Sequence, residues 1–385
     1  MKILLSIKNY FFYKVLKLNA VSVKEAKIIT EYINHFEEPK DYFERSYLQY
    51  LCQKKQYEDA RTYNFLYTLL NFFSLMALLL LLITPNSVYK ILFKPNKIHA
   101  DAITMFGQVL DDRIPFELKN EYFSIKYLER KGILLSGIEK KFVLSLWKRY
   151  PCSVNFVLKN ALKIGTYSYA INNTQDIKAI IASCEYSYTS SILTEYCRYK
   201  NVEHINIMHG EIIVELTKTF FAFDRFYVWD KYYVDLCTER MRAPREQFVV
   251  AVPECLIFDE SKSLEKIEYK YYFQDQNEEQ IIEVKKILDK LSKNYMVRSH
   301  PIYTEYEIVY ENFDLTRVED NSVPIEDSIM EAQNIIAWDS TVLLQAYLNN
   351  KNAIIDDVTD QVRYKTSAEA GYIMTNKCEK LSKLI

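Results

Sequence analysis

The stretch "NIIAWDSTVLLQAYLNNKNAII" (334–355) joins two short apolar runs through a turn rich in hydroxyls and a segment of helical length. Parallel strands need such a crossover, because the chain must return to the same edge of the sheet before the next strand begins. The same alternation continues from about residue 100 to the end of the chain. The expected helices include 189–201, 277–294 and 340–351. The expected strands are 102–107, 132–137, 177–183, 204–210, 225–230, 248–253, 269–274, 295–300, 315–319, 334–340, 352–357 and 371–375.

The length of the chain favours two such α/β domains. A chain of 385 residues exceeds the size at which one hydrophobic core keeps growing. The polar, proline-bearing stretch 239–247 is the expected linker. The prediction is therefore a helical region at 1–99, a first Rossmann-like domain at 100–240 that binds an acceptor, and a second at 241–385 that binds a nucleotide sugar. Two domains of this kind place a cleft between the carboxyl ends of their strands.

Charge, cysteine and glycine usage exclude several classes of function. The 49 basic and 51 acidic residues are interspersed and form no basic stripe, which speaks against nucleic acid as a partner. The seven cysteines form no CxxC pair, which speaks against a disulfide framework or a zinc site. The six glycines form neither a dinucleotide-binding motif nor a phosphate-binding P-loop. We expect neither a cofactor nor a metal.

The segment "FLYTLLNFFSLMALLLLLI" (65–83) carries no charge over 19 residues. At 1.5 Å per residue, such a helix is long enough to cross a hydrocarbon core of about 30 Å. Basic residues flank it on both sides, which suits a helix in or on an anionic leaflet. The alternatives are a buried core helix and a spanning helix. We expect association with a membrane surface, at the cytoplasmic face of the inner membrane.

Polar residues that suit a ligand site follow three of the expected strands. They are His209, the pair Ser299–His300, and the run Asp339–Ser340–Thr341. In open parallel sheets, ligands bind beyond the carboxyl ends of the strands. An imidazole, two hydroxyls and the N-terminus of the helix that begins near Ser340 could together hold a phosphate.

Three of these stretches carry a family resemblance. In order and approximate spacing, "HINIMHGE" (204–211), "MVRSHP" (296–301) and the stretch 334–355 resemble motifs of GT-B glycosyltransferases of bacterial surface polysaccharide synthesis. The likeness is nearest to the HP-motif sialyltransferases and polysialyltransferases that use CMP-activated sugars. It is looser to the capsule Kdo transferases and the teichoic-acid glycerophosphotransferases. It covers roughly residues 175–360.

The resemblance implies roles for residues of the second domain. His300, paired with Pro301, would contact the nucleotide phosphate together with Ser340 and Thr341. The loop near 320 would read the base. A carboxylate of the helix that follows, Glu326 or Asp327, would hold the ribose, although these acids could equally complement the helix dipole. Arg298 could neutralise phosphate, or strand alternation could turn it away from the cleft.

The catalytic base is expected in the first domain, where three residues remain open. Family members place a carboxylate before a glycine, whereas "SCEYSYTSS" (183–191) offers Glu185 without that glycine. His209 or Glu211 could equally accept the proton, as the histidine of an HG pair does in the glycerophosphotransferase-like families. Gly210 is expected to supply a positive φ after the strand.

Together these features predict a metal-independent, inverting glycosyltransferase. A CMP-sugar is the preferred donor, with sialic acid as the nearest example, and the acceptor is a glycan or glycolipid. One alternative is a glycerol- or ribitol-phosphate transferase of the teichoic type. Another is a catalytically inactive scaffold subunit of a polysaccharide machine.

Overall fold

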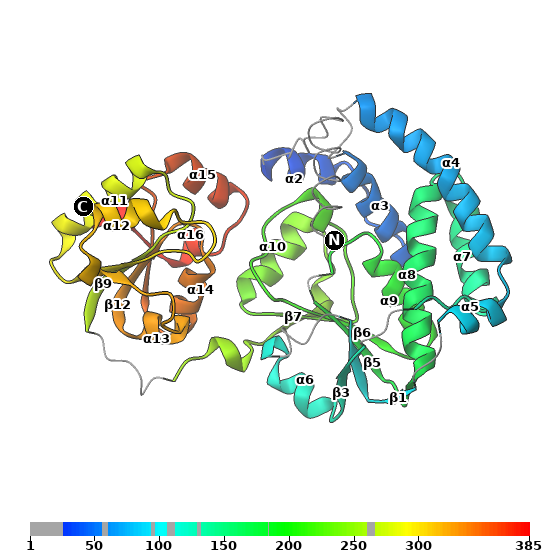
Figure 1. Ribbon diagram of the computed structural model, residues 1–385. Coiled ribbons are helices and arrows are strands. Elements are labelled where there is room, and N and C mark those ends of the chain that lie inside the picture. Colours follow the sequence, from blue (N-terminus) through cyan, green and yellow to red (C-terminus); the bar gives the residue numbers. More distant parts are fainter. Residues whose placement is uncertain are drawn as a thin grey trace. The chain divides into compact units, whose positions relative to one another are not determined.

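The chain folds into two compact units, each with its own six-stranded parallel sheet (Figure 1). The computed structural model describes residues 26–55, 61–93, 97–105, 112–128, 132–183, 185–259 and 266–385. The first unit comprises residues 1–209 and 214–251, and the second comprises 210–213 and 252–385. This architecture confirms the predicted fold class of two Rossmann-like α/β domains with a helical N-terminal region.

The sheet of the first unit has the order β3-β2-β5-β6-β7-β8, and all of its neighbours are parallel. Its strands are β2 (Ala102–Thr104), β3 (Ile125–Tyr127), β5 (Ala179–Ser183), β6 (Glu203–Ile207), β7 (Arg225–Val228) and β8 (Phe248–Val250). A separate two-stranded parallel sheet joins β1 (Ile98–His99) to β4 (Thr174–Gln175). From β2 the chain builds the sheet first toward β3 and then, from β5 onward, in the opposite direction. The order therefore reverses between β2 and β5.

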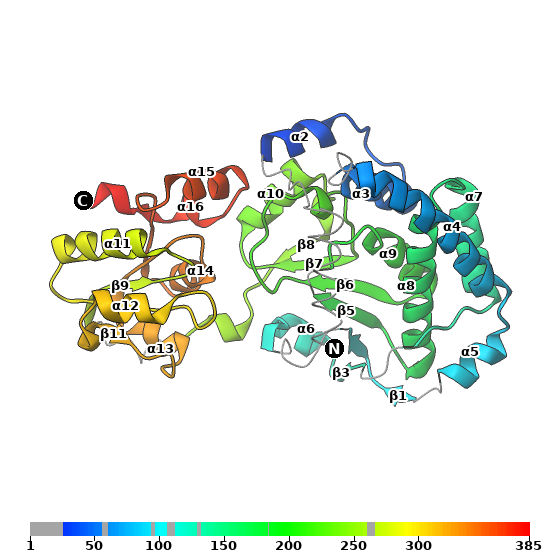
Figure 2. The ribbon, with the colours of Figure 1, turned by 45° about the horizontal axis from the view of Figure 1, so that its top comes forward.

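Alternate residues of these strands enter two different cores. Ile103 and Ile180 belong to a large core built with helices, whereas Ala102 and Ile181 belong to a smaller core on the other face, which includes Leu118 of α6. This alternation follows from the two-residue repeat of a strand. Figure 2 shows α8 and α9 on one side of this sheet and α6 on the other. The helices that follow the N-terminal region are α6 (Phe116–Glu121), α7 (Gly137–Arg149), α8 (Val154–Asn173), α9 (Ser190–Tyr199) and α10 (Lys231–Met241).

The N-terminal helices are built into the first unit. They are α2 (Ala26–Asn34), α3 (Tyr42–Lys55), α4 (Arg61–Ile83) and α5 (Asn86–Leu92). The buried Ser46 hydroxyl of α3 accepts a hydrogen bond from the backbone N–H of Ile192 at 3.1 Å. Arg45 donates to the carbonyl of Arg242 at 2.7 Å. A buried hydroxyl bonded to the backbone of α9 ties α3 to the Rossmann core, so the two share one folding unit.

The sheet of the second unit has the order β11-β10-β9-β12-β13-β14, again all parallel. Numbered along the chain this order is 3-2-1-4-5-6, which is the Rossmann arrangement, with its reversal between β9 and β12. The strands are β9 (Ile267–Tyr272), β10 (Tyr295–Arg298), β11 (Val318–Glu319), β12 (Ala332–Ala337), β13 (Asn352–Ile355) and β14 (Glu379–Lys380). The helices are α11 (Glu278–Leu291), α12 (Tyr306–Asn312), α13 (Ile325–Met330), α14 (Thr341–Leu348), α15 (Gln361–Glu369) and α16 (Met374–Lys377).

Two expected strands are wrong. Residues 132–136 run without strand pairing along α8, where the N–H of Leu134 bonds to the carbonyl of Gly165 at 2.9 Å. A Cβ built on Gly165 would lie 2.6 Å from Ile133, so glycine permits this close approach. Residues 371–375 form a turn and the start of α16, and the apolar residues there are buried without joining the sheet. In both places an apolar run is buried by packing alone.

The division between the units falls after Ala251, whereas the sequence places a linker at 239–247. Met241 is the last residue of α10, and Gln247 ends a short 3₁₀ helix that leads into β8. Strand β8 pairs with β7 in the first sheet. Pairing to a neighbouring strand therefore holds residues 248–250 in the first unit, although their apolar character alone fits either domain.

The apolar segment 65–83 lies within α4. Within the described part of the chain, no individual helix combines the length and apolar character that crossing a membrane requires. Only the bent pair 69–83 and 86–92, with 99° between its two helices, meets those criteria jointly. These criteria for a membrane span consider only the length and the composition of the helices.

A buried ionic cluster joins three strands of the second unit. The fully buried ammonium of Lys270 on β9 lies 2.5 Å from Glu319 of β11, and Arg298 of β10 lies 2.8 Å from the same carboxylate. The buried Ser328 hydroxyl also donates to Glu319. Glu331 approaches Lys270 at 3.6 Å and is more exposed. Removing one partner from such a cluster leaves a buried charge without compensation.

We expect Glu319→Gln to destabilise the protein by about 3–5 kcal/mol, since Lys270 and Arg298 would lose the carboxylate between them. The matched control is Glu331→Gln, which removes the more exposed acid near the same ammonium and should cost about 1 kcal/mol or less. Urea unfolding followed by circular dichroism measures both. Equal stability of the two variants would contradict the role assigned to this cluster.

Candidate active site

A cavity of about 450 Å3 opens where the strand order of the second unit reverses. The parallel strands on either side of a reversal send their crossovers to opposite faces, which leaves a crevice at their carboxyl ends. Here that crevice lies beyond β9 and β12. The predicted residues that line it are Arg298, Ser299, His300, Pro301, Asp339, Ser340 and Thr341. Sequence-distant residues thus meet in one pocket, as their positions after strands predict.

The hydrogen bonds of His300 determine which ring nitrogen carries a proton. Its Nδ1 accepts from the backbone N–H groups of Ile302 at 3.1 Å and Tyr303 at 3.3 Å. Burial lowers the pKa of His300, against the charge of Asp275, so the ring is neutral near pH 7. A neutral imidazole that accepts at Nδ1 must carry its hydrogen on Nε2. His300 is therefore a neutral donor with one defined N–H.

Ser299 contributes a buried hydroxyl to the wall of this pocket. Its side chain is buried, with 2% of the residue exposed, and it lines the cavity. Its Oγ has no hydrogen-bond partner among the described residues. Buried polar atoms are almost always paired, because an unpaired hydroxyl loses its bonds to water without compensation. A ligand oxygen in the cavity would supply the partner.

Helix α14 directs its N-terminus at the same cavity. Ser340 is its N-cap and accepts a hydrogen bond from the N–H of Val342 at 3.3 Å, and Thr341 follows as the first helical residue. The first-turn N–H groups of a helix lack partners within the helix and carry partial positive charge. Both Thr341 and Val342 line the cavity. This end of the pocket suits an anionic oxygen.

The charged side chains at this pocket are engaged within the protein. Arg298 binds Glu319 and also donates to the carbonyl of Val323 at 2.8 Å. Asp339 accepts from Arg363 at 2.6 Å and from the Ser367 hydroxyl at 2.7 Å. The structure therefore places the two charged members of the predicted site in the wall, each neutralised by an opposite charge.

Glu326 and Asp327 do not line this cavity. Both lie in the first turn of α13, and from that helix only Ile325 reaches the pocket wall. Their position matches the alternative in which the acids complement a helix dipole. Ribose binding by either residue stays a prediction.

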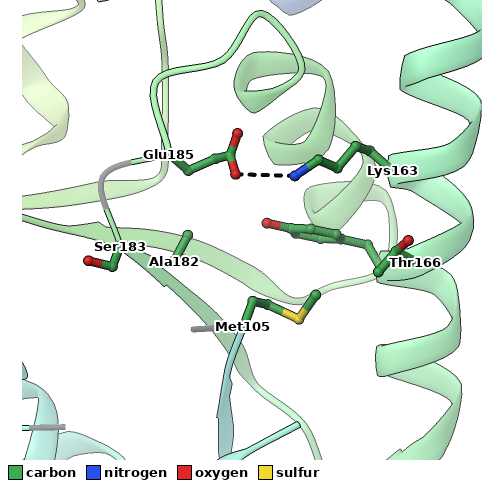
Figure 3. Close-up of a pocket in the computed structure, with 7 residues that line it drawn as sticks. Met105, Lys163, Thr166, Ala182, Ser183 and Glu185 are labelled. Carbon is green, nitrogen blue, oxygen red and sulfur yellow. Dashed lines mark hydrogen bonds and ion pairs between the residues drawn. The ribbon is translucent and has the colours of Figure 1, made fainter. Parts of the chain in front are cut away.

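The first unit has a cavity of about 320 Å3 at its own reversal point, between β2 and β5 (Figure 3). Met105 directly follows β2, while Ala182 and Ser183 end β5. Helix α8 contributes Lys163, and the loop after β5 contributes Glu185. Both domains thus present a pocket at the position that the topology of a parallel sheet favours.

Glu185 faces this pocket as an ionised carboxylate. Figure 3 shows its side chain directed toward Lys163, whose Nζ lies 3.2 Å away. Burial opposes ionisation, but the charge of Lys163 and the hydrogen bond from Ser187 hold the pKa of Glu185 below its ordinary value. The backbone N–H of Glu185 donates to Asn206 Oδ1 at 3.2 Å, which fixes the loop to β6.

His209 is not among the residues that line the pocket, but it contacts Ser183, which is. Its Nδ1 lies 3.1 Å from the Ser183 hydroxyl, which lines the cavity. Burial, together with the positive charges of Arg113 and Lys218, lowers the pKa of His209, so its imidazole is neutral near pH 7. The structure therefore brings two of the three candidate bases to neighbouring strand ends.

Glu211 and Gly210 are assigned to the second unit. Residues 210–213 belong to the second unit, where the charge of Glu211, added to burial, raises the pKa of Cys378 to about 12. The prediction of a positive φ at Gly210 is wrong, because Gly371 is the glycine with positive φ among the described residues. A Cβ at Gly210 would meet nothing within 4 Å.

Sequence reasoning missed several residues of these pockets. Lys163 and Thr166 of α8 line the first cavity, and Gln274 and Tyr303 line the second. Lys163 lies in an ordinary helical pattern, and only the fold brings it to Glu185. Tyr303 stacks on His300 with ring centroids 4.5 Å apart, and its nearness to the HP pair was the one available signal. The described residues contain no cluster of three or more His, Cys, Asp or Glu that could hold a metal ion.

Comparisons with known proteins find similarity only among solved structures. No protein-family model matches the chain. No curated protein matches it either. The wall teichoic acid polymerase TagF, soaked with CDPG, is 10% identical over 80% of this chain and 83% of that chain, with a TM-score of 0.39. A protein designated as a UDP-N-acetylglucosamine 2-epimerase from Listeria monocytogenes is 9% identical over 72% of this chain and 83% of that chain, with a TM-score of 0.38. Similarities this low carry no argument about the activity of this chain.

Proposed function

We propose that the protein is a glycosyltransferase that uses a nucleotide-activated sugar. The donor occupies the pocket of the second unit, and the acceptor occupies the pocket of the first. The proposed reaction is inverting and metal-independent, and a CMP-sugar is the preferred donor. We thus propose the enzymatic activity itself, together with the classes of donor and acceptor.

One observation carries the proposal, namely that three neutral donors converge on the cavity of the second unit. They are the Nε2–H that the hydrogen bonds of His300 define, the unpartnered Ser299 hydroxyl and the N-terminus of α14. Together they suit an oxygen that carries or develops negative charge. The leaving phosphate of a nucleotide sugar is such a group. A hydrogen bond from a neutral N–H or O–H group to a charged oxygen contributes about 1.5–3 kcal/mol to binding.

In this mechanism Glu185 is the base that acts on the acceptor. A hydroxyl in the first pocket gives its proton to the Glu185 carboxylate as its oxygen bonds to the anomeric carbon. The bond between that carbon and the phosphate oxygen breaks, and its electron pair stays on the nucleotide. We assign the base to Glu185 and not to His209 because the Glu185 side chain lines the pocket, whereas His209 contacts the pocket through Ser183.

A second candidate is a glycerol- or ribitol-phosphate transferase of the teichoic type, and the state of His209 favours it. Burial and the nearby cations lower the pKa of this imidazole, so it is neutral near pH 7 and able to accept a proton from an alcohol. In that case the alcohol oxygen bonds to the phosphorus of the transferred group as its proton passes to His209. The phosphoanhydride bond of the donor breaks, and its electron pair leaves with the nucleoside monophosphate. The phosphate-binding role proposed for the second pocket is the same in both reactions.

The test is a donor screen with the purified full-length protein over CMP-, CDP-, UDP- and GDP-activated compounds in the presence of EDTA. We expect turnover of a CMP-sugar, and His300→Ala should lower it by about 100-fold or more through lost stabilisation of the leaving phosphate. The control His35→Ala changes an exposed histidine in the turn after α2 and should leave turnover unchanged. Failure of the wild type to bind any of the four classes would leave the inactive scaffold as the function. Full turnover in His300→Ala would refute the phosphate role.

Ser299→Ala separates ligand binding from folding. The Ser299 hydroxyl has no partner in the described structure, so its removal should leave the melting temperature unchanged or slightly higher. Donor affinity should fall by about tenfold, the value of one hydrogen bond to a charged oxygen. Thermal melts and calorimetry measure the two effects. A large loss of stability with unchanged affinity would mean that the hydroxyl serves the fold.

The pH dependence of turnover distinguishes the two bases, because a base must be unprotonated to act. The pKa of Glu185 lies below 4.5, so with Glu185 as base the rate should stay level from pH 8 down to about pH 5. The pKa of His209 lies below 6.5, so a histidine base would lose activity as the pH falls through that lower value. Glu185→Gln should abolish turnover with donor affinity intact, and His209→Asn should be mild. The reverse pattern, with Glu211→Gln as a further control, would assign the base to His209 and favour the phosphate transferase.

A further inference from the structure

Helix α4 exposes large apolar side chains over the face that points away from the protein. Its buried side carries Ser74 and Leu78, with 8% and 0% of their surfaces exposed. About half a turn around the helix, Phe73, Met76 and Leu80 expose 63%, 51% and 58%. Exposed apolar patches of this kind mark interaction sites, because burying them away from water is favourable.

The buried side of α4 is fixed to the first unit. Helix α4 packs along α8, and both views show the two helices side by side (Figures 1 and 2). The Ser74 hydroxyl bonds to the Asn155 side chain, and the N–H of Asn155 donates to Asn71 at 3.4 Å. A helix that spans a bilayer is surrounded by lipid or by other spanning segments. Helix α4 has a water-soluble α/β domain along one side, which is incompatible with spanning.

Helix α5 continues the apolar surface around a sharp bend. It leaves α4 at 99°, and Ile91 and Leu92 at its end expose 72% and 67%. The Tyr89 hydroxyl donates to the carbonyl of Leu81 at 2.8 Å, which braces the bend. We refer to the exposed apolar residues of α4 and α5 as the apolar elbow.

The charge around the apolar elbow indicates what covers it. Residues 60–100 contain no Asp or Glu, while Arg61, Lys90, Lys94 and Lys97 lie among them. The exposed Lys90 belongs to α5 itself. Among the described residues of α4 and α5, the exposed apolar side chains thus lie beside a lysine and no carboxylate of their own helices, which is complementary to an anionic lipid surface. Two-fold pairing with a second copy would instead oppose like charges, since the same patch serves both partners.

We propose that the apolar elbow docks the protein onto an anionic lipid bilayer as an in-plane, monotopic anchor. The apolar side chains enter the boundary between headgroups and acyl chains, and Lys90 contacts the headgroups. Helix α8, against which α4 packs, also carries Lys163 of the first pocket. The anchor and the proposed acceptor site are therefore built on one rigid element. The docking itself does not depend on the proposed function.

Vesicle flotation with the purified full-length protein tests the proposal without any activity assay. Vesicles of phosphatidylcholine alone are compared with vesicles that contain about one third phosphatidylglycerol. The wild type should float with the anionic vesicles. The double variant Phe73→Glu/Leu80→Glu should reduce the bound fraction by about tenfold or more, since two charges would enter the apolar boundary. Lys90→Glu should weaken binding to the anionic vesicles by about fivefold or more and leave neutral vesicles unaffected.

Phe123→Glu is the matched control, because Phe123 is 90% exposed on the same unit and lies outside the apolar elbow. It should float like the wild type. Thermal melts establish that each variant folds. We expect folding to be retained because the substituted positions are exposed. Equal flotation of the double variant and the wild type would overturn the proposal. A wild type that stays off both vesicles and forms a dimer that the double variant abolishes would also overturn it, in favour of a second copy on this face. Resistance of the membrane-bound protein to alkaline carbonate would overturn the in-plane arrangement.

Discussion

Right-handed crossovers between parallel strands determine where crevices open in the two sheets of this protein. A sheet that grows in one direction from its first strand places its helices on one face, and growth in the other direction places them on the opposite face. At the reversal, the loops after two adjacent strands diverge. The two cavities lie at these points, beyond β2 and β5 in one unit and beyond β9 and β12 in the other. Both sites therefore follow from chain topology before any side chain is considered.

Side chains then determine what each crevice can hold. In the second unit the charges are neutralised within the wall, Arg298 by Glu319 and Asp339 by Arg363. The groups of this pocket that would face the proposed ligand are neutral dipoles, of which the His300 N–H is oriented by hydrogen bonds to the backbone. Fixed dipoles stabilise developing charge without reorganising during the reaction. In the first unit, by contrast, an ion pair lines the pocket itself, so an acceptor would meet the charges of Lys163 and Glu185 directly.

The sequence predicted the residues of the second pocket better than those of the first, for a physical reason. Ser299, His300 and Ser340 lie within three residues of the end of β10 or β12, and parallel strands end at one common edge. Their convergence needs only the fold class. Lys163 comes from the middle of α8, and its approach to Glu185 depends on how α8 crosses the sheet, which no local pattern encodes. The apolar runs at 132–137 and 371–375 were mistaken for strands because burial alone does not distinguish strand pairing from packing.

The apolar elbow is a second feature whose surroundings could not be predicted from a local sequence pattern. Composition alone left a spanning helix, a surface helix and a core helix open for segment 65–83, with association with a membrane surface as the expectation. The structure gives its two sides different surroundings. Ser74 and Leu78 are buried against the first unit, whereas Phe73 and Leu80 remain exposed. A core helix would bury both sides, and a spanning helix would carry no soluble domain along its length. One buried stripe and one exposed apolar stripe are what the proposed in-plane anchor requires, so the length of an apolar run matters less than what its two faces touch.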